Sequence, residues 1–142
     1  MATITTEQAP AAKPISKSVI LTTAYQDIIV VDNYDVPVIG FAADRRTAPG
    51  VAEISSPLIL SNATGTSKTA SVRIQRGGQA FTVINDVLIE PNEVVYIPLN
   101  GQFLLSETND VLQAVSDSVG GVHAMISYTQ GQAEEDNVLG DI

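Results

Sequence analysis

From Ser18 onward, short apolar or alternating runs are separated by turn residues roughly every eight to twelve positions. This spacing is typical of all-β domains, because a strand takes about five or six residues and each reversal needs residues such as Gly, Pro or Asn. In "ASVRIQR", Ala70, Val72 and Ile74 alternate with polar side chains, as expected for a strand with one buried face. The strands number about nine or ten, which predicts an antiparallel β-sandwich of jelly-roll or Greek-key type.

Glycine-containing pairs mark the tightest turns. Gly77-Gly78 predicts a two-residue hairpin into "QAFTVIN", because glycine reaches positive φ angles at little cost. Asn100-Gly101 predicts a second hairpin, between "VVYIPL" and "QFLL". Gly120-Gly121 is interpreted in the same way, as the connection from "VLQAVS" to "VHAMISYT".

Other segments leave alternatives open. "VILTTAYQDIIVV" (19–31) predicts two strands or one long bent strand, and "DVPVIGFAA" (35–43) an edge strand or an irregular segment before a loop at 44–50. "ISSPLILSNA" (54–63) predicts one strand. "TNDVLQAVS" (108–116) is compatible with a strand or with a helical turn capped by Thr108.

The chain divides into three parts by composition. Residues 1–17 are mainly Ala, Thr, Pro, Lys and Gln and predict a flexible N-terminal arm. Residues 18–132 form the β-sandwich domain, a size that can bury a substantial core. Residues 133–142 are predicted to be an acidic C-terminal tail.

Charge is distributed unevenly along the chain. The formal net charge is −9, from 7 Lys and Arg against 16 Asp and Glu, and every Lys and Arg lies within residues 1–76. Such an acidic surface repels phosphate backbones, so direct nucleic-acid binding is not expected. The chain has no cysteine, which excludes disulfides, thiolate metal sites and a cysteine nucleophile.

The N-terminus lacks the basic and apolar regions of a secretory signal, and no apolar run approaches the ~18 residues that span a bilayer. We therefore expect a soluble protein with no membrane partner. Because no export is expected, we interpret the glycosylation sequon Asn62-Ala63-Thr64 as a chance occurrence.

His123, the single histidine, precedes an acidic cluster of Glu134, Glu135 and Asp136. In a strand over residues 122–129, His123 shares a face with Met125, Ser127 and Thr129. Catalytic and metal-binding histidines need partners, and the sequence offers no second His and no Cys. We therefore predict no catalytic residue, no metal site and no cofactor.

Three loop patterns suggest chemistry only weakly. "GTSKT" (65–69) resembles the end of a phosphate-binding loop but lacks the two required glycines, and is predicted to be a turn. "DNYD" (32–35) and "ETND" (107–110) offer oxygen ligands for calcium, without the spacing of an EF-hand. Paired carboxylates of a small hydrolase remain possible in principle, but the chain has no Trp for stacking on sugars.

The arginines are conspicuous in a chain whose second half has no basic residue. They are Arg45, Arg46, Arg73 and Arg76. Two interpretations stay open: exposed solubilising charge, or contacts to carboxylates of a neighbouring subunit.

The run from "SSPLILSNAT" through "ASVRIQRGGQAFTVINDVLIEPNEVVYIPLNGQFLLSETNDVLQAVSDSVGGVHAMISYTQGQ" resembles small virion proteins of tailed bacteriophages, over about residues 18–132. Shared features are the "NAT" turn, "SVRI", "IEPNEVVYIPL", "DVLQA" and "VHAMIS". The resemblance implies a capsid decoration (cement) protein, often trimeric, on the outer surface of the head.

The resemblance also implies the partners and location. We expect binding to the major capsid protein of a phage head, self-association as a homotrimer, synthesis in the host cytoplasm and incorporation into the virion. The alternative is a receptor- or glycan-binding module of a tail or fibre. An aromatic-lined groove would favour glycans, and a flat apolar patch beside the arm would favour a cement role.

Overall fold

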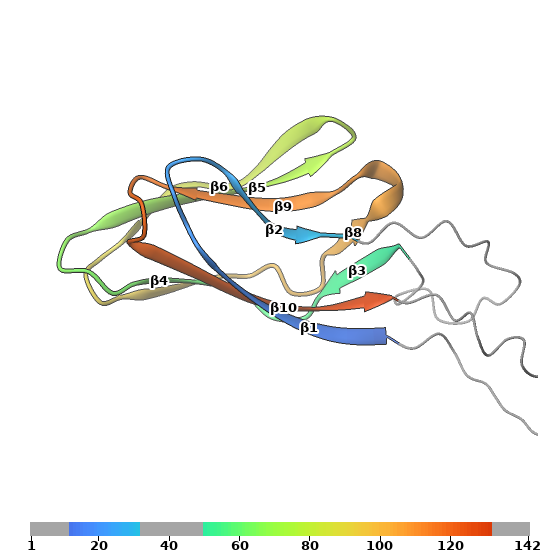
Figure 1. Ribbon diagram of the computed structural model, residues 1–142, viewed down its shortest axis with the longest axis horizontal. Helices are drawn as coiled ribbons and strands as arrows, with labels where there is room; N and C mark the ends of the chain where they lie inside the picture. The colour runs from blue at the N-terminus through green and yellow to red at the C-terminus, as the bar shows by residue number, and fades with distance from the viewer. Residues whose placement is uncertain (1–11, 32–49, 132–142) are drawn as a thin grey trace, which may run out of the picture.

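The computed structural model describes residues 12–31 and 50–131, which form two antiparallel β-sheets packed face to face (Figure 1). This architecture confirms the predicted all-β sandwich. Ten strands and one 3-10 turn, Ser106–Thr108, lie within these ranges. The same ranges contain no helix of the length and hydrophobicity needed to cross a membrane.

The two sheets have six and four strands. We call the first sheet A; its strands are β1 (Ala12–Ile20), β3 (Val51–Ile54), β4 (Leu58–Asn62), β7 (Val94–Ile97), β8 (Phe103–Leu105) and β10 (Val122–Gly131). We call the second sheet B; its strands, in spatial order, are β2 (Gln26–Val30), β9 (Val111–Ser116), β5 (Lys68–Arg76) and β6 (Gln79–Ile89).

The six strands of sheet A occupy only four positions across the sheet, because two of these positions are each filled by two shorter strands that lie end to end. β1 pairs with one edge of β10 over its whole length, so β3 and β4 must both pair with the other edge. β8 and β7 pair in turn with β3 and β4. β3 and β4 are thus the two halves of one line, broken at residues 55–57, and β7 and β8 are the halves of the next.

The strand pairs are nested along the chain. β5 pairs with β6 in the middle, β4 and β3 pair with β7 and β8, β2 pairs with β9, and β1 pairs with β10. Apart from the β5–β6 hairpin and the two interrupted lines, each connection passes from one sheet to the other. Two four-position sheets built from nested antiparallel pairs constitute a jelly roll.

The core lies between the sheets and consists of alternate side chains from both. Leu60 and Ala124 of sheet A and Val72 and Leu112 of sheet B are fully buried. The predicted alternation in β10 is confirmed: the side chains of the even-numbered residues 122–130 are buried and His123 is exposed. In β2, a register shift between Asp27 and Ile29 allows two consecutive isoleucines, residues 28 and 29, to enter the core.

Of the three predicted hairpins, only Gly77-Gly78 forms one. It joins β5 to β6, with Arg76 opposite Gln79 and both glycines at positive φ, 61° and 85°. The prediction for Asn100-Gly101 is wrong, because β7 and β8 continue along the same neighbouring line instead of pairing with each other. The prediction for Gly120-Gly121 is also wrong, since β9 lies in sheet B and β10 in sheet A.

The ambiguous segments are resolved in favour of strands. Residues 19–31 contain the end of β1 and the whole of β2, so two strands form there. The single strand predicted over 54–63 is wrong in detail, because Ser55–Pro57 interrupt it; Ser56 Oγ instead accepts a hydrogen bond from Ser127 N at 2.9 Å. Residues 111–116 form β9 rather than a helix. The segment 35–43 and residues 44–49 lie outside the described residues.

The predicted boundary of the N-terminal arm is wrong for residues 12–17. These residues belong to β1, which pairs with β10 from Ala12–Gly131 to Ile20–His123. Ile15 packs against the core, and Lys17 Nζ lies 3.5 Å from the carbonyl oxygen of Ile28 in the other sheet. Backbone pairing therefore extends the domain further than the composition of this segment indicated. Residues 1–11 and the predicted acidic tail, 133–142, lie outside the described residues.

Candidate binding surface

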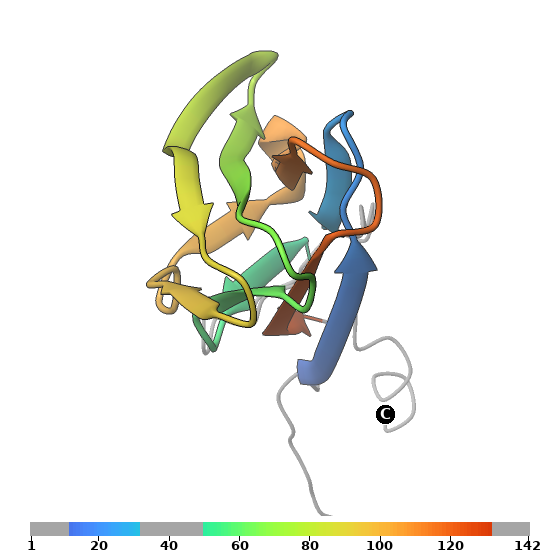
Figure 2. The same cartoon turned by 90° about the vertical axis from the view of Figure 1, so that its left-hand side faces the viewer.

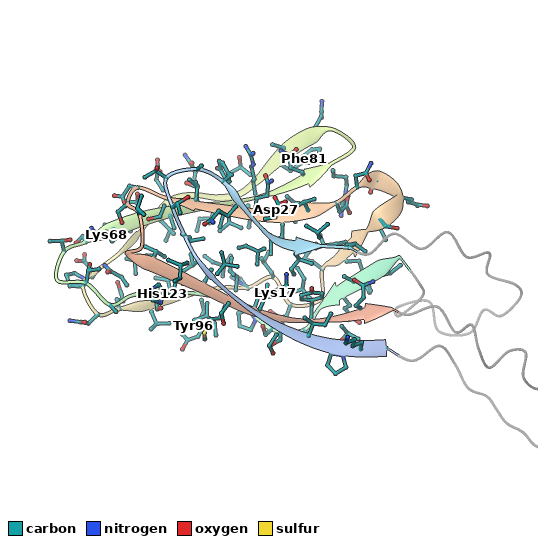
Figure 3. The ribbon with its side chains drawn as sticks, in the orientation of Figure 1. Lys17, Asp27, Lys68, Phe81, Tyr96 and His123 are labelled. Carbon is teal, nitrogen blue, oxygen red and sulfur yellow. The ribbon has the colours of Figure 1, made fainter. Side chains whose placement is uncertain are left out.

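The outer face of sheet A presents apolar side chains from all four strand positions at the end where β10 begins. The cross-strand register aligns them in two rows. The first row is Ile20, His123, Ser61 and Val94, and the second is Ser18, Met125, Ile59 and Tyr96. Tyr96 and His123 lie on this outer side of the sandwich (Figure 3). We call the five apolar members, Ile20, Ile59, Val94, Tyr96 and Met125, the apolar face.

The apolar face is unusually exposed for residues of this kind. The exposed fractions are 62% for Tyr96, 57% for Ile20, 46% for Met125 and 43% for Val94. Neither row contains an Asp, Glu, Lys or Arg. A contiguous exposed apolar patch of this kind, with polar surroundings, typically marks a binding site, whereas single exposed apolar residues need no explanation.

Local alternation explains why these side chains point outward. In β7, Val95 and Ile97 face the core, so Val94 and Tyr96 must face solvent. In β10 the buried even-numbered residues force Met125 outward. Alternation in the sequence places Met125 on the same face as His123, but it does not predict the apolar face, because alternation within one strand does not reveal which strands are neighbours.

The middle of the outer face of sheet B is polar and internally connected, while exposed Val30 and Leu88 lie on its two edge strands. Arg73 Nε donates a hydrogen bond to Gln113 Oε1 at 2.8 Å, and Gln113 Nε2 donates to Asp27 Oδ1 at 2.7 Å. The Arg73 guanidinium also stacks on the Tyr25 ring, 3.6 Å from its centroid. We call this set, Tyr25, Asp27, Arg73 and Gln113, the polar ladder. The sequence left two interpretations of Arg73 open, an exposed solubilising charge or a contact to a neighbouring subunit. In the structure, Arg73 has partners within its own chain.

A buried carboxylate fixes the corner before β9. Asp110 Oδ2 accepts hydrogen bonds from Arg76 Nη2 at 2.7 Å and from Leu105 N at 2.9 Å, while Thr108 Oγ1 donates to Oδ1 at 2.7 Å. Arg76 is 44% exposed and Asp110 is not exposed at all. Arg76 thus pairs within its own chain. The "ETND" stretch is a closed, hydrogen-bonded corner, not an open set of calcium ligands.

The same contacts set the charge states of this pair. Burial opposes ionisation of Asp110, but hydrogen bonds from Arg76, Thr108 and Leu105 together outweigh it and hold the pKa of the carboxyl below its ordinary value. The hydrogen bond to Asp110 raises the pKa of Arg76. Both groups are therefore charged at neutral pH.

Asn62 organises the turn that follows β4. Its buried side chain donates to the carbonyl oxygens of Thr66 at 2.8 Å and Ile89 at 2.9 Å, and it accepts from Thr64 N at 2.9 Å. These bonds give Asn62 of the sequon a structural role. Because its side chain is 1% exposed, it is not accessible to a glycan. "GTSKT" contains the end of this turn and the start of β5, as predicted for a turn.

His123 lies in the first row of the outer face, between Ile20 and Ser61. Among the residues that the structure describes, no three His, Cys, Asp or Glu side chains are grouped so that they could hold a metal ion. Glu134, Glu135, Asp136, Arg45, Arg46 and the "DNYD" stretch lie outside the described residues.

Comparison with known proteins adds no functional assignment: no protein-family model matches this chain, and no curated protein is significantly similar to it in sequence.

Proposed function

We propose that this chain is a structural protein of a tailed-phage virion, a decoration (cement) protein that binds the major capsid protein on the outer surface of the head. The observation that carries the proposal is the apolar face, an exposed and uncharged surface on sheet A that contrasts with the internally bonded polar ladder on sheet B. Such a surface favours a function in binding over one in catalysis.

Two further arguments support this role. The sequence resembles small phage virion proteins, and the jelly roll recurs in viral capsid and lectin domains. The fold alone does not decide the function, because the same sandwich serves many roles. The local geometry bears on the two main alternatives: the patch lies along the face of a sheet and contains one aromatic side chain, Tyr96, although it is at the Ile20 end of β1 and not at the Ala12 end next to the predicted arm. That arrangement favours a cement role over an aromatic glycan groove.

The proposed mechanism is repeated weak binding. One patch on four strands about 4.8 Å apart covers a small area, which supports only modest affinity for one copy. Symmetric repetition over a capsid, and association of copies as the proposed homotrimer, would convert many weak contacts into firm attachment. The protein would be made in the host cytoplasm and would need neither nucleic acid nor a membrane for this role.

Binding to phage heads provides the test. Heads of the encoding phage that lack this protein are incubated with purified wild-type or variant protein, and bound copies are quantified by sedimentation and located by electron microscopy. Tyr96→Asp places a charge in the apolar face and should reduce affinity about a hundredfold. Tyr25→Asp is the matched control on the other side of the sandwich and should bind like the wild type.

Two results would overturn the proposal. Wild-type protein that does not bind heads, or that attaches only to tails or fibres, would exclude the cement role. Equal binding by both aspartate variants would show that the apolar face is not the contact surface.

A further inference from the structure

Among the described strands, only β5 pairs with β6, so the second edge of β6 has no strand beside it. β6 occupies the end of the order β2-β9-β5-β6. Eight of its eleven residues are exposed, including Phe81 at 52% and Val83 at 37%. The β5–β6 hairpin curves away from the rest of the sandwich, so both faces of its outer part are accessible (Figure 2). Phe81 lies on this projecting part (Figure 3).

The other free edges carry features that discourage pairing with another chain. β1 has Lys13, Pro14 and Lys17, and charged residues and proline are common protective devices on edge strands. β2 is short and contains a bulge, and the β7–β8 line is interrupted at residues 98–102. β6 also has register shifts, but these lie beyond Thr82, so residues 79–82 are the least protected edge among the described strands.

The outer part of β6 has the composition of a pairing strand. Residues 79–84, "QAFTVI", contain no charged residue and no proline. Register shifts in the β5–β6 pairing occur only beyond Thr82, and Asp86 has a positive φ of 51°. The first shift falls at Val83, so only residues 79–82 of this part of the edge are regular. An unprotected strand of this kind is a ready template for a further strand.

We propose that this edge pairs with the same edge of a second copy of the chain, with two β6 strands antiparallel across a two-fold axis. Charge argues for this occupant. Two copies that each carry a net charge of −9 repel one another over most of their surfaces, and residues 79–84 form an uncharged strip where they can approach. A partner attracted by opposite charge would be expected to bind the acidic residues, and not this uncharged strip.

Identical side chains can face each other in this contact without conflict. Phe81, which shares a face with Ile74, would meet apolar residues of the second copy, while Ala80 and Thr82 would meet on the other face. No like charges are opposed. A two-fold contact joins copies in pairs, so it is distinct from the three-fold association proposed above and independent of capsid binding. Because the paired segment is short, association should depend on concentration.

Site-specific cross-linking tests the pairing directly, because the wild-type chain has no cysteine. Thr82→Cys places one thiol on the exposed edge, and Thr66→Cys places one on an exposed turn near the other end of β6. With a short bis-maleimide at high protein concentration, Thr82→Cys should give at least tenfold more covalent dimer than Thr66→Cys. Equal yields would overturn the proposal.

Amide hydrogen exchange of the wild-type protein provides a second readout that no cross-linker can bias. Exchange of residues 79–84 should slow as the concentration rises from micromolar to millimolar. Thr82→Glu should remove this protection, since it places a carboxylate opposite Ala80 of the second copy and puts two like charges on one face of the contact, while Arg73 across the β5–β6 pair keeps the variant folded. Thr66→Glu is the matched control and should retain the protection.

Two exchange results would count against a second copy. Exchange at residues 79–84 that does not depend on concentration would overturn the proposal. Protection that appears only when phage heads are added would assign the edge to a capsid strand instead. Failure of the cement role would be recognised separately, because Tyr96→Asp affects the other surface.

Discussion

The polar ladder on sheet B and the apolar face on sheet A use their side chains in opposite ways. On sheet B, Arg73, Gln113 and Asp27 are joined to one another across three strands, and Tyr25 covers the guanidinium. On the outer face of sheet A, Tyr96 and Met125 are apolar and exposed to solvent.

Because of this difference, we expect the polar ladder to contribute to stability and the apolar face to contribute to binding. Side chains of the polar ladder contribute to the free energy of unfolding, because their partners lie within the chain. Side chains of the apolar face contribute little to it, since their exposed surface is buried in neither the folded nor the unfolded monomer. An apolar side chain that folding leaves exposed is available to a partner.

The largest effect should come from breaking sheet A itself. Deleting residues 1–17 removes six of the nine residues of β1, including Ile15, and uncovers the edge of β10. The free energy of unfolding should fall by roughly 2–4 kcal/mol, from lost backbone hydrogen bonds and apolar burial. Urea titration followed by circular dichroism measures this change. Deleting residues 1–11 is the control, and unchanged stability after the longer deletion would show that β1 is dispensable.

On the sheet B side, the strongest single contact is the buried carboxylate. Asp110→Ala leaves Leu105 N–H and Arg76 without their acceptor and should cost about 2–3 kcal/mol of stability. Chemical denaturation at neutral pH checks this value. The neighbouring Glu107→Ala, at an exposed position of the same corner, is the control. Similar stability of the two variants would contradict the anchoring role of Asp110.

The same carboxylate predicts acid sensitivity. Because the folded-state pKa of Asp110 lies below the ordinary value of 3.8, the folded protein binds fewer protons than the unfolded chain in that range. The stabilisation is therefore complete above pH 3.8 and is lost as the pH falls through the folded pKa. Unfolding midpoints at a series of acid pH values should show a steeper decline for wild type than for Asp110→Asn. Parallel declines would assign the acid sensitivity to other carboxyls.

A smaller effect is expected from breaking the polar ladder. Arg73→Ala removes the hydrogen bond to Gln113 and the stacking on Tyr25, and should cost about 1–2 kcal/mol. Tyr96→Ala on the apolar face should change stability by less than about 0.5 kcal/mol. Thermal denaturation of both variants compares the faces directly, and an equal loss from both would remove the distinction between them.

The smallest effect is expected at His123, which is exposed on the outer face of sheet A. His123→Ala should change the free energy of unfolding by less than about 0.5 kcal/mol, because nothing in the core depends on the imidazole. Denaturation combined with metal analysis of the purified protein checks this expectation. Loss of a bound metal ion on substitution would show that His123 is a ligand.

The candidate site was only partly predictable from the sequence. Alternation in β10 correctly separated His123 and Met125 from the core residues. It did not place Tyr96 beside Met125, because these residues lie on β7 and β10, and Ile59 of β4 lies between them. Arg76 and Asp110 belong to separate sequence motifs, predicted as surface or interface charge and as a weak calcium-ligand stretch, yet they are partners across 34 residues of sequence.

Local sequence patterns are enough to predict the fold class, the alternation of buried and exposed residues within strands, and the positions of turns. These properties depend on neighbouring residues: a period of two fixes which side chains share a face, and glycine allows positive φ wherever it occurs. Only the tertiary structure decided which strands pair. Gly77-Gly78 and Asn100-Gly101 give similar local signals, yet the first joins paired strands and the second joins two halves of one line. A turn reverses or bends the chain locally, whereas the partner of each strand is selected by burial of apolar surface between the two sheets, to which the whole chain contributes.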